Sequence, residues 1–160
     1  NTKKVAEDFI IQNSSNSLII RTTIVGKNIN KSKTSFVEWI VDSLSKRKEI
    51  NLFDNVLFSP ITIWSLCNEI EWILRNNIFG LFHISGLESV SKYDFGMSLC
   101  NAMDLDKTLI HRSDIEDFNF IARRQKNQTM NSSRYQKISL RSLPTFDDTI
   151  KDIVKNYNSH

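Results

Sequence analysis

A nearly continuous run of apolar residues, LIIRTTIVG at positions 18–26, is the strongest strand signal in the first part of the chain. A run of this kind predicts a strand that is covered on both faces, as parallel strands in α/β proteins are. Residues 3–12 before it predict an amphipathic helix whose apolar side carries Val5, Ala6, Phe9 and Ile10. A helix followed by a buried strand is half of a parallel-sheet unit, so the pattern favours an α/β fold.

Four later segments repeat apolar residues at helical spacing and predict further helices. They cover residues 36–44, 61–76, 89–105 and 146–157. Hydroxyl residues that can cap a helix precede or open three of them, namely Thr34 or Ser35, Ser91, and Thr145. Acidic residues in the first turns support these starting points, because a carboxylate is stabilised at the positive end of the helix dipole.

Short extended segments lie between these helices and complete the α/β pattern. The predicted strands are 50–53, 56–58, 79–84 and 108–111, and Pro60 prevents a helix immediately before it. Residues 114–120 predict an acidic, aromatic loop, and residues 122–129 a polar, basic one.

Composition points to one domain and disfavours several classes of function. With 160 residues and 40% hydrophobic content, the chain is long enough for a core of its own. The net charge of +3 comes from interspersed charges and not from a basic patch, so nucleic-acid binding has little support. The sequence shows no signal peptide and no apolar run of membrane-spanning length, which predicts a cytoplasmic protein without a membrane partner.

The sequence pattern around the two cysteines agrees with the predicted cytoplasmic location. Cys67 and Cys100 lie within apolar helical patterns, which predicts reduced cysteines in the core and no disulfide. Neither has a neighbouring Cys or His at metal-ligand spacing, so we expect no metal site.

Few side chains stand out as candidates for chemistry when the residues are considered alone. His83 lies on a predicted buried strand, where a structural histidine is more common than a catalytic one. Arg123 and Arg124 are better candidates, because a planar guanidinium can grip phosphate with two hydrogen bonds, although adjacent arginines are also common on solvated surfaces. The chain has no Gly-x-Gly-x-x-Gly loop that would cradle a dinucleotide pyrophosphate.

Several motifs occur in the same order as in a known enzyme family. They are NTKKVAED (1–8), RTTIVG (21–26), SFVEWI (35–40), FSPITIWSL (58–66), IFGLFHISG (78–86) and ARRQKNQTM (122–130). NTKKVAED resembles the Tyr-Gly-x-(Ser/Thr)-Lys-x-x-Ala-Glu helix of extended short-chain dehydrogenases/reductases, RTTIVG their Arg-Thr-Ser-Trp-Val-Tyr strand end, and SFVEWI their Asn-Phe-Val helix start. FSPITIWSL resembles their Gly-x-Pro-Thr segment, IFGLFHISG their Gly-x-Tyr-His-x-x-Gly strand, and ARRQKNQTM their Arg-Pro-x-Asn-(Ser/Thr)-x-Leu loop. The chain is thus similar to the C-terminal half of that family, and most of all to its dTDP-4-dehydrorhamnose reductase group.

The resemblance implies catalytic and cofactor contacts near the start of the chain. Lys3 matches the family's catalytic lysine, which binds the nicotinamide ribose and lowers the pKa of a proton-donating tyrosine. Thr22 and Thr23 match the stretch that passes beside the nicotinamide. The matching tyrosine would fall before Asn1, outside this sequence.

The resemblance also implies a set of substrate-binding residues. Ile24 stands where the rhamnose reductases have a substrate-contacting Trp, and Ser35 stands where they have Asn. Asn55 stands at the position of their Asp. Arg124 matches an arginine that grips the diphosphate in related sugar-nucleotide enzymes, and Asn127 matches the polar residue that follows it.

These resemblances imply an α/β fold that combines the last strands of a Rossmann-type parallel sheet with a mainly helical substrate-binding lobe. We expect residues 1–30 to be the C-terminal part of a dinucleotide-binding domain and residues 31–160 to be the lobe, with 78–86 returning to the sheet as a strand. The implied function is the substrate-binding portion of an NAD(P)-dependent sugar-nucleotide reductase. NAD(P)H is the expected cofactor of the full-length parent, whereas this chain alone is expected to bind none and to be inactive.

Two other functions remain open. The same fold serves epimerases and dehydratases of NDP-sugars, and a non-catalytic binding or regulatory relative would also explain departures from the family pattern at Ile24, Ser35 and Gln125. The expected partner is a nucleotide-sugar substrate. Strands without their sheet would also favour self-association or pairing with an N-terminal half.

Overall fold

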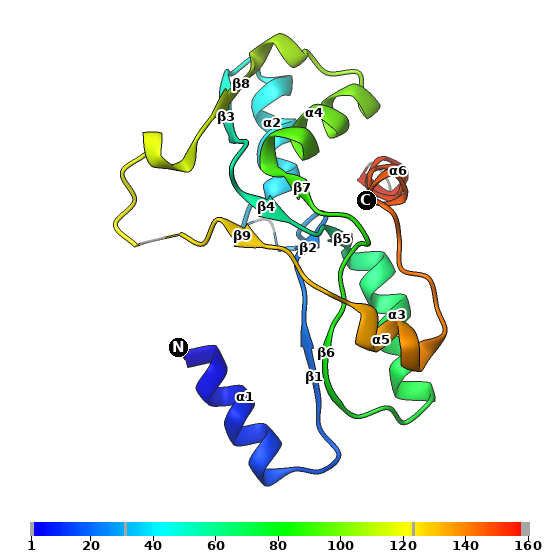
Figure 1. The fold of residues 1–160 in the computed structure, drawn as a ribbon. Helices are drawn as coiled ribbons and strands as arrows, with labels where there is room; N and C mark the ends of the chain where they lie inside the picture. The colour runs from blue at the N-terminus through cyan, green and yellow to red at the C-terminus, as the bar shows by residue number, and fades with distance from the viewer. Residues whose placement is uncertain (1, 31, 123, 158–160) are drawn as a thin grey trace.

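The computed structural model describes residues 2–30, 32–122 and 124–157, which form an α/β fold (Figure 1). Its helices are α1 (Thr2–Asn13), α2 (Phe36–Ser45), α3 (Ile63–Arg75), α4 (Lys92–Ala102), α5 (Ser133–Ser139) and α6 (Phe146–Tyr157), with 3₁₀ turns η1 (Lys107–Leu109) and η2 (Ile115–Asp117). The strands are β1 (Leu18–Arg21), β2 (Ile24–Val25), β3 (Ile50–Phe53), β4 (Leu57–Phe58), β5 (Ile61–Thr62), β6 (Gly80–His83), β7 (Val90–Ser91), β8 (Ile110–Ser113) and β9 (Asn127–Gln128). The predicted α/β class is confirmed.

The predicted strand at 18–26 is divided into two strands with different partners. β1 pairs in parallel with β6, so that Arg21 lies opposite His83. β2 pairs in parallel with β5. Thr22 and Thr23 lie between the two strands and belong to neither. The sequence therefore predicts the place of this element, but not the break at which its pairing partner changes.

Residues 2–21 contribute little to the core. Figure 1 shows α1 beside β1, away from the bulk of the molecule, and no side chain of Thr2–Asn13 is buried. Val5 and Phe9 are each 66% exposed, and within β1 only Ile19 is buried. The expectation that this strand is covered on both faces is wrong within the described chain. The reason is that α1, the helix beside β1, leaves its apolar side in solvent, so that Leu18 and Ile20 of β1 are only partly buried.

The main core lies between the parallel pair β3–β8 and the helices α2, α4 and α6. Gly96 of α4 allows a close approach to β3, because a Cβ built on Gly96 would lie 2.1 Å from Leu52 Cδ1. A three-stranded sheet, with the strand order β7–β4–β9, lies beside this core. It brings residues 90–91, 57–58 and 127–128 together. Val56, Lys92 and Gln128, in or next to these strands, line the cleft described below.

Helix starts follow the caps that the sequence predicts. Ser35 Oγ accepts a hydrogen bond from the Glu38 N–H at 3.1 Å, and the Glu38 carboxylate accepts one from the Ser35 N–H at 2.8 Å, so the α2 cap is reciprocal. Ser91 caps α4 in the same position. Thr145 and Asp148 form the equivalent pair at the start of α6.

Three sequence-based expectations need correction. Cys67 lies on the exposed side of α3, whereas Cys100 is buried as predicted, and both thiols are free. The predicted strand at 108–111 begins as the 3₁₀ turn η1, and β8 starts only at Ile110. The sequence pattern does not predict α5, because only Tyr135 and Ser139 of this short helix are buried and no apolar repeat marks it.

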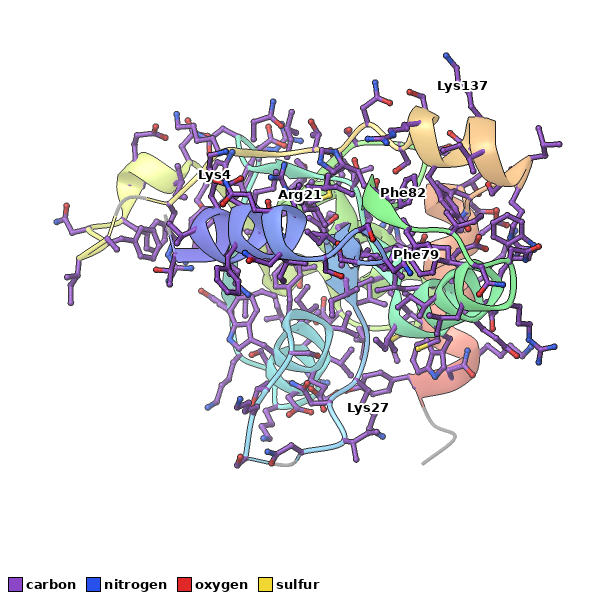
Figure 2. The ribbon with its side chains drawn as sticks, turned by 90° about the horizontal axis from the view of Figure 1, so that it is seen from below. Lys4, Arg21, Lys27, Phe79, Phe82 and Lys137 are labelled. Atoms are coloured by element: carbon purple, nitrogen blue, oxygen red, sulfur yellow. The ribbon has the colours of Figure 1, made fainter. Side chains whose placement is uncertain are left out.

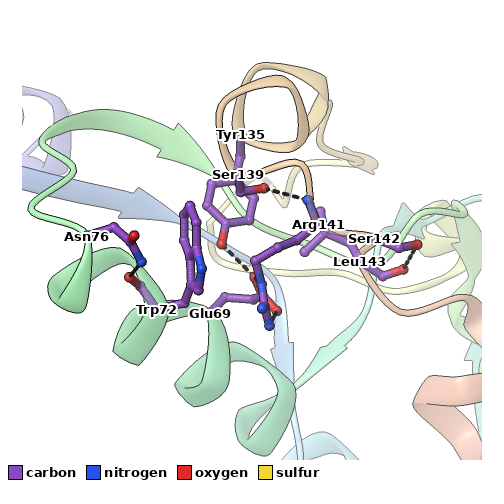
Figure 3. Close-up of polar contacts among 8 residues, drawn as sticks. All are labelled: Glu69, Trp72, Asn76, Tyr135, Ser139, Arg141, Ser142 and Leu143. Carbon is purple, nitrogen blue, oxygen red and sulfur yellow. Dashed lines mark hydrogen bonds and ion pairs between the residues drawn. The ribbon is translucent and has the colours of Figure 1, made fainter.

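A buried acid joins α3 to the chain after α5 (Figure 3). Glu69 is only 5% exposed, and its carboxylate accepts hydrogen bonds from the Tyr135 hydroxyl at 2.5 Å and from Arg141 Nε at 2.8 Å. Burial and the neighbouring Glu69 carboxylate raise the pKa of Tyr135, so its hydroxyl stays a donor. The three side chains hold α5 and the following segment against α3.

Candidate functional site

A cleft of about 720 Å³ opens between α2, β3, the start of α4 and the loop that runs from η2 to β9. Its lining includes the aromatic side chains of Trp39, Phe53 and Phe118 and the cationic side chains of Lys92 and Arg124. The loop projects from the body of the molecule between β8 and β9 (Figure 1). An apolar cleft with a few polar groups is the usual form of a small-molecule site, so this cleft is the first candidate.

Aromatic contacts fold the loop wall of the cleft onto β3. The ring of Phe53 lies edge-on to the rings of Phe118 and Phe120, with centroid distances of 5.3 Å and 6.1 Å. The guanidinium carbon of Arg124 lies 4.5 Å from the Phe120 ring centroid. Arg124 is exposed and therefore presents a cation at the mouth of the cleft.

Asn55 anchors the same wall. Its amide Nδ2 donates to Glu116 Oε2 at 2.7 Å, and its Oδ1 accepts from the Ile115 N–H at 3.0 Å. Glu116 also forms an ion pair with Lys126 on the other side of the loop. The hydrogen-bonded Lys126, and then Asn55, hold the pKa of Glu116 below its usual value. The amide of Asn55 thus ties η2 and the segment around Lys126 to the turn after β3.

Lys92 lies at the opposite wall, in the first turn of α4. Its Nζ is 3.3 Å from the centroid of the Phe58 ring and 4.6 Å from that of Phe36. Burial lowers the pKa of Lys92 to about 8. The sequence carries no signal for a role of Lys92, because a lysine in a helical pattern normally lies on the solvent side.

Ile24 and Ser35 meet in a smaller cleft of about 310 Å³ between β2 and the start of α2. Phe36 lines both this cleft and the larger one. The Ser35 hydroxyl is used as the cap of α2, so it offers a ligand its remaining hydrogen-bonding capacity only. Two of the predicted substrate-binding residues therefore lie together, with the larger cleft next to them.

Asn127, the last predicted substrate-binding residue, belongs to β9, which pairs with β4. Its Oδ1 accepts hydrogen bonds from the N–H and the hydroxyl of Thr129, at 3.0 Å and 2.7 Å. This local turn holds the end of the cleft loop and leaves the Asn127 amide N–H groups exposed to solvent.

The predicted cofactor residues Lys3, Thr22 and Thr23 lie near the start of the chain, the first in α1 and the other two between β1 and β2. The Thr23 hydroxyl donates to the Ser59 carbonyl. The Thr22 Oγ1 is buried and has no hydrogen-bond partner among the described residues. A buried hydroxyl without a partner is costly, which makes Thr22 a candidate for contact with a polar ligand. Lys3 lies on the exposed α1.

An ion pair without a signal in the sequence joins α1 to the end of β1. Figure 2 shows Arg21, one of its partners, beside α1. Arg21 Nε and Nη2 donate to the two carboxylate oxygens of Glu7 at 3.0 Å and 2.5 Å. Arg21 Nη1 also lies 3.4 Å from His83 Nε2 across the β1–β6 pair. His83 is partly buried and hydrogen-bonded, which agrees with a structural histidine.

Other site classes have little basis in the described residues. Arg123 lies outside the part of the chain that the structure describes. Among the described residues, no three His, Cys, Asp or Glu side chains are grouped closely enough to hold a metal ion. None of the described helices combines the length and the apolar character that crossing a membrane requires.

Parallel strand pairs, a helical lobe and an adjoining cleft define a Rossmann-like α/β fold. Residues 1–159 match the RmlD substrate binding domain family, and the chain belongs to this family. The resemblance to extended short-chain dehydrogenases/reductases, drawn from six ordered motifs, is thereby confirmed.

Individual relatives agree with the family. The probable low-salt glycan biosynthesis reductase Agl14 of Haloferax volcanii is 22% identical over 151 residues, which are 93% of this chain and 50% of the relative. The fold matches dTDP-4-dehydrorhamnose reductase of Bacillus anthracis, in complex with NADP, with a TM-score of 0.88, 18% identity and coverage of 97% of this chain and 54% of that one. dTDP-glucose 4,6-dehydratase of the same organism, in complex with NAD, matches with a TM-score of 0.74, 12% identity and coverage of 99% and 50%. The chain thus spans about half the length of these relatives.

Proposed function

We propose that this chain is the substrate-binding portion of an NAD(P)-dependent sugar-nucleotide reductase. The observation that carries the proposal is the cleft, where the cations Lys92 and Arg124 lie beside aromatic rings in a member of the RmlD substrate binding domain family. A nucleotide sugar presents a flat base and a diphosphate, and these are the groups that aromatic rings and cations bind.

Within this proposal, the substrate extends from the large cleft to the small one. Arg124 holds the diphosphate at the mouth of the large cleft, because its planar guanidinium can donate two parallel hydrogen bonds. Ile24 and Ser35 in the small cleft contact the sugar. Asn55 and Asn127 lie on the side of the substrate that faces the loop between β8 and β9. Both already shape this loop through their own hydrogen bonds.

The residues at the end of β1 fit a dinucleotide cofactor. NAD(P)H, when bound, supplies the hydride for reduction of a keto sugar. The buried Thr22 hydroxyl, which has no partner among the described residues, has the capacity to hold a polar group of the cofactor. Lys3 can hold the ribose and stabilise a nearby phenolate. Thr23 has the lesser role, because its hydroxyl is already bonded to the Ser59 carbonyl.

We further propose that residues 1–30 complete a dinucleotide-binding domain and that residues 31–160 form the substrate lobe, with 78–86 in the sheet. We also propose that the chain alone does not reduce a substrate. The exposed apolar side of α1 and the edge of β1 that no described strand pairs support this proposal. A preceding part of the sheet, or a second chain, is the proposed cover. The free thiols agree with a cytoplasmic location.

The test uses the full-length protein that contains this chain. We expect it to consume NADPH or NADH when a dTDP-4-keto sugar is added, and we expect the Lys3→Met variant to lose at least about 100-fold in rate while keeping its fold. The isolated chain should show no turnover. Turnover by the isolated chain would contradict the proposed division, and the absence of turnover by the full-length protein with any such sugar would contradict the reductase.

A second candidate is an epimerase or dehydratase of NDP-sugars. The structural match to a dTDP-glucose 4,6-dehydratase favours it specifically. Product identification together with cofactor consumption separates the two. A reductase oxidises one NAD(P)H for each product, whereas an epimerase or dehydratase reduces and reoxidises its cofactor within one cycle and consumes none. A regulatory relative would bind the nucleotide sugar without consuming any cofactor.

A further inference from the structure

Lys92 is a cation in an aromatic setting at the wall of the large cleft. Its Nζ lies 3.3 Å from the Phe58 ring centroid and 4.6 Å from the Phe36 ring centroid. Among the described residues, no carboxylate lies within ion-pairing distance of Lys92. Glu49, the acid that lines the same cleft, instead lies 3.2 Å from His111 Nε2.

A charge in this position is costly unless a ligand compensates it. Desolvation disfavours a buried ammonium group, and the two ring faces recover part of that loss. Lys92 also occupies the first residue of α4, where the helix dipole disfavours a cation. Asp94 lies in the same turn, but its carboxylate is exposed and accepts from the Ser91 hydroxyl. A side chain with a purely structural role would be more stable here without the charge.

We propose that Lys92 recognises a phosphate group of the nucleotide sugar and acts as the second cation of the cleft, with Arg124 as the first. The proposal rests on the proposed function and assigns a further specificity-determining residue to it. Phe36 and Phe58 keep the ammonium group at the cleft wall, and the phosphate supplies the negative charge that the protein does not. The pKa of Lys92, which burial lowers, agrees with this assignment.

The test measures nucleotide binding to the full-length protein by tryptophan fluorescence, for which Trp39 is the natural reporter because it lines the same cleft. Lys92→Met removes the charge and keeps a flexible chain that packs well against phenyl rings. Lys92→Arg keeps the charge. Lys137→Met on the exposed face of α5 is the matched control, since it removes a lysine far from the cleft (Figure 2). Circular dichroism and thermal unfolding establish that each variant folds.

We expect K92M to weaken binding of dTDP by about tenfold or more, because a charge-assisted contact to phosphate is lost. Binding of dTDP should stay within about threefold of the wild-type value for K92R and within about twofold for K137M. Binding of thymidine, which has no phosphate, should be equal in all four proteins. Equal affinity of dTDP for K92M and the wild type would overturn the inference and leave the proposed function intact.

Binding of inorganic pyrophosphate tests the anion site at Lys92 independently of the proposed nucleotide-sugar function. If the wild type binds no dTDP but binds pyrophosphate in a manner that K92M abolishes, the anion site stands and the nucleotide-sugar function fails. If the wild type binds neither, both proposals are wrong.

Discussion

Arg141 and Glu69 form a two-pronged ion pair that closes the chain after α5 onto α3, with Nε and Nη2 of Arg141 at 2.8 Å and 2.9 Å from the Glu69 carboxylate oxygens. Glu69 is buried, so removal of Arg141 leaves a carboxylate whose remaining hydrogen-bond donor among the described residues is the Tyr135 hydroxyl. We expect Arg141→Met to lower the free energy of unfolding by about 2 kcal/mol, a value reduced for the partial exposure of the arginine.

Urea denaturation measures this change, and the surface pair Arg75–Glu71 supplies the control. Its side chains are 76% and 59% exposed, so Arg75→Met should change the free energy of unfolding by no more than about 0.5 kcal/mol. Equal effects of the two variants would show that burial does not strengthen the Arg141–Glu69 pair.

Arg21 and Glu7 provide the main polar tie between α1 and β1, since no residue of Thr2–Asn13 is buried. We expect Arg21→Met to raise the hydrogen-exchange rates of α1 amides by about tenfold, with little change in α4. The Lys4–Asp8 pair lies within α1 and is exposed, so Lys4→Met should leave these rates nearly unchanged.

The same pair predicts a pH dependence. The hydrogen bond from Arg21 is the largest cause that lowers the pKa of Glu7 in the folded chain. A carboxylate with a lowered folded pKa stabilises the folded state above its unfolded pKa, and this stability is lost as pH falls through the folded value. Protection of α1 should therefore decrease on acidification below about pH 4, and Glu7→Gln should remove that part of the decrease.

Asn55 and Glu116 offer a way to separate substrate contact from loop support. If Asn55 acts by holding the loop, Asn55→Ala and Glu116→Gln should both weaken dTDP binding, each by about three- to tenfold, because each breaks the anchor at η2. Binding titration followed by the fluorescence of Trp39 measures both. Loss of affinity in the Asn55 variant alone would instead indicate direct contact between Asn55 and the ligand.

Lys92 predicts two pH effects of opposite sign. Its folded pKa of about 8 lies below the value of 10.5 for an unperturbed lysine, so the unfolded chain binds more protons between these values. The free energy of unfolding of the wild type, relative to that of Lys92→Met, should thus rise as the pH increases from about 8 to about 10. Affinity for dTDP should fall over the same range, because the ammonium charge is lost. A K92M protein whose dTDP affinity falls in parallel with the wild type would contradict the second effect.

Gly96 and Leu52 give a prediction about packing. A Cβ on Gly96 would lie 2.1 Å from Leu52 Cδ1, so Gly96→Ala should destabilise the fold by about 1–3 kcal/mol despite the better helix propensity of alanine. Asn101→Ala, at an exposed position of the same helix, is the control and should have no destabilising effect. The double variant G96A/L52A should lose less stability than the sum of the single changes, because the shortened side chain at position 52 makes room for the methyl group.

Features that depend on neighbours in the sequence could be predicted without a structure. The Ser35–Glu38 cap and the apolar repeats of α2, α3, α4 and α6 involve residues three or four positions apart, so the amino-acid order alone determines them. The order of the motifs likewise identified the family. The same local reasoning missed α5, whose buried residues Tyr135 and Ser139 interact with other segments and form no repeat of their own.

The cleft is different, because its parts are far apart in the chain. Lys92 meets Phe36 and Phe58 through the pairing of β7 with β4, and the loop wall reaches Phe53 through the pairing of β3 with β8. The sequence by itself determined the helices, their caps and the α/β class, since these follow from contacts within a few residues. Only the tertiary structure decided that Lys92 is a partly desolvated cation at a cleft and that the apolar side of α1 is exposed, since burial depends on which distant segments pack together.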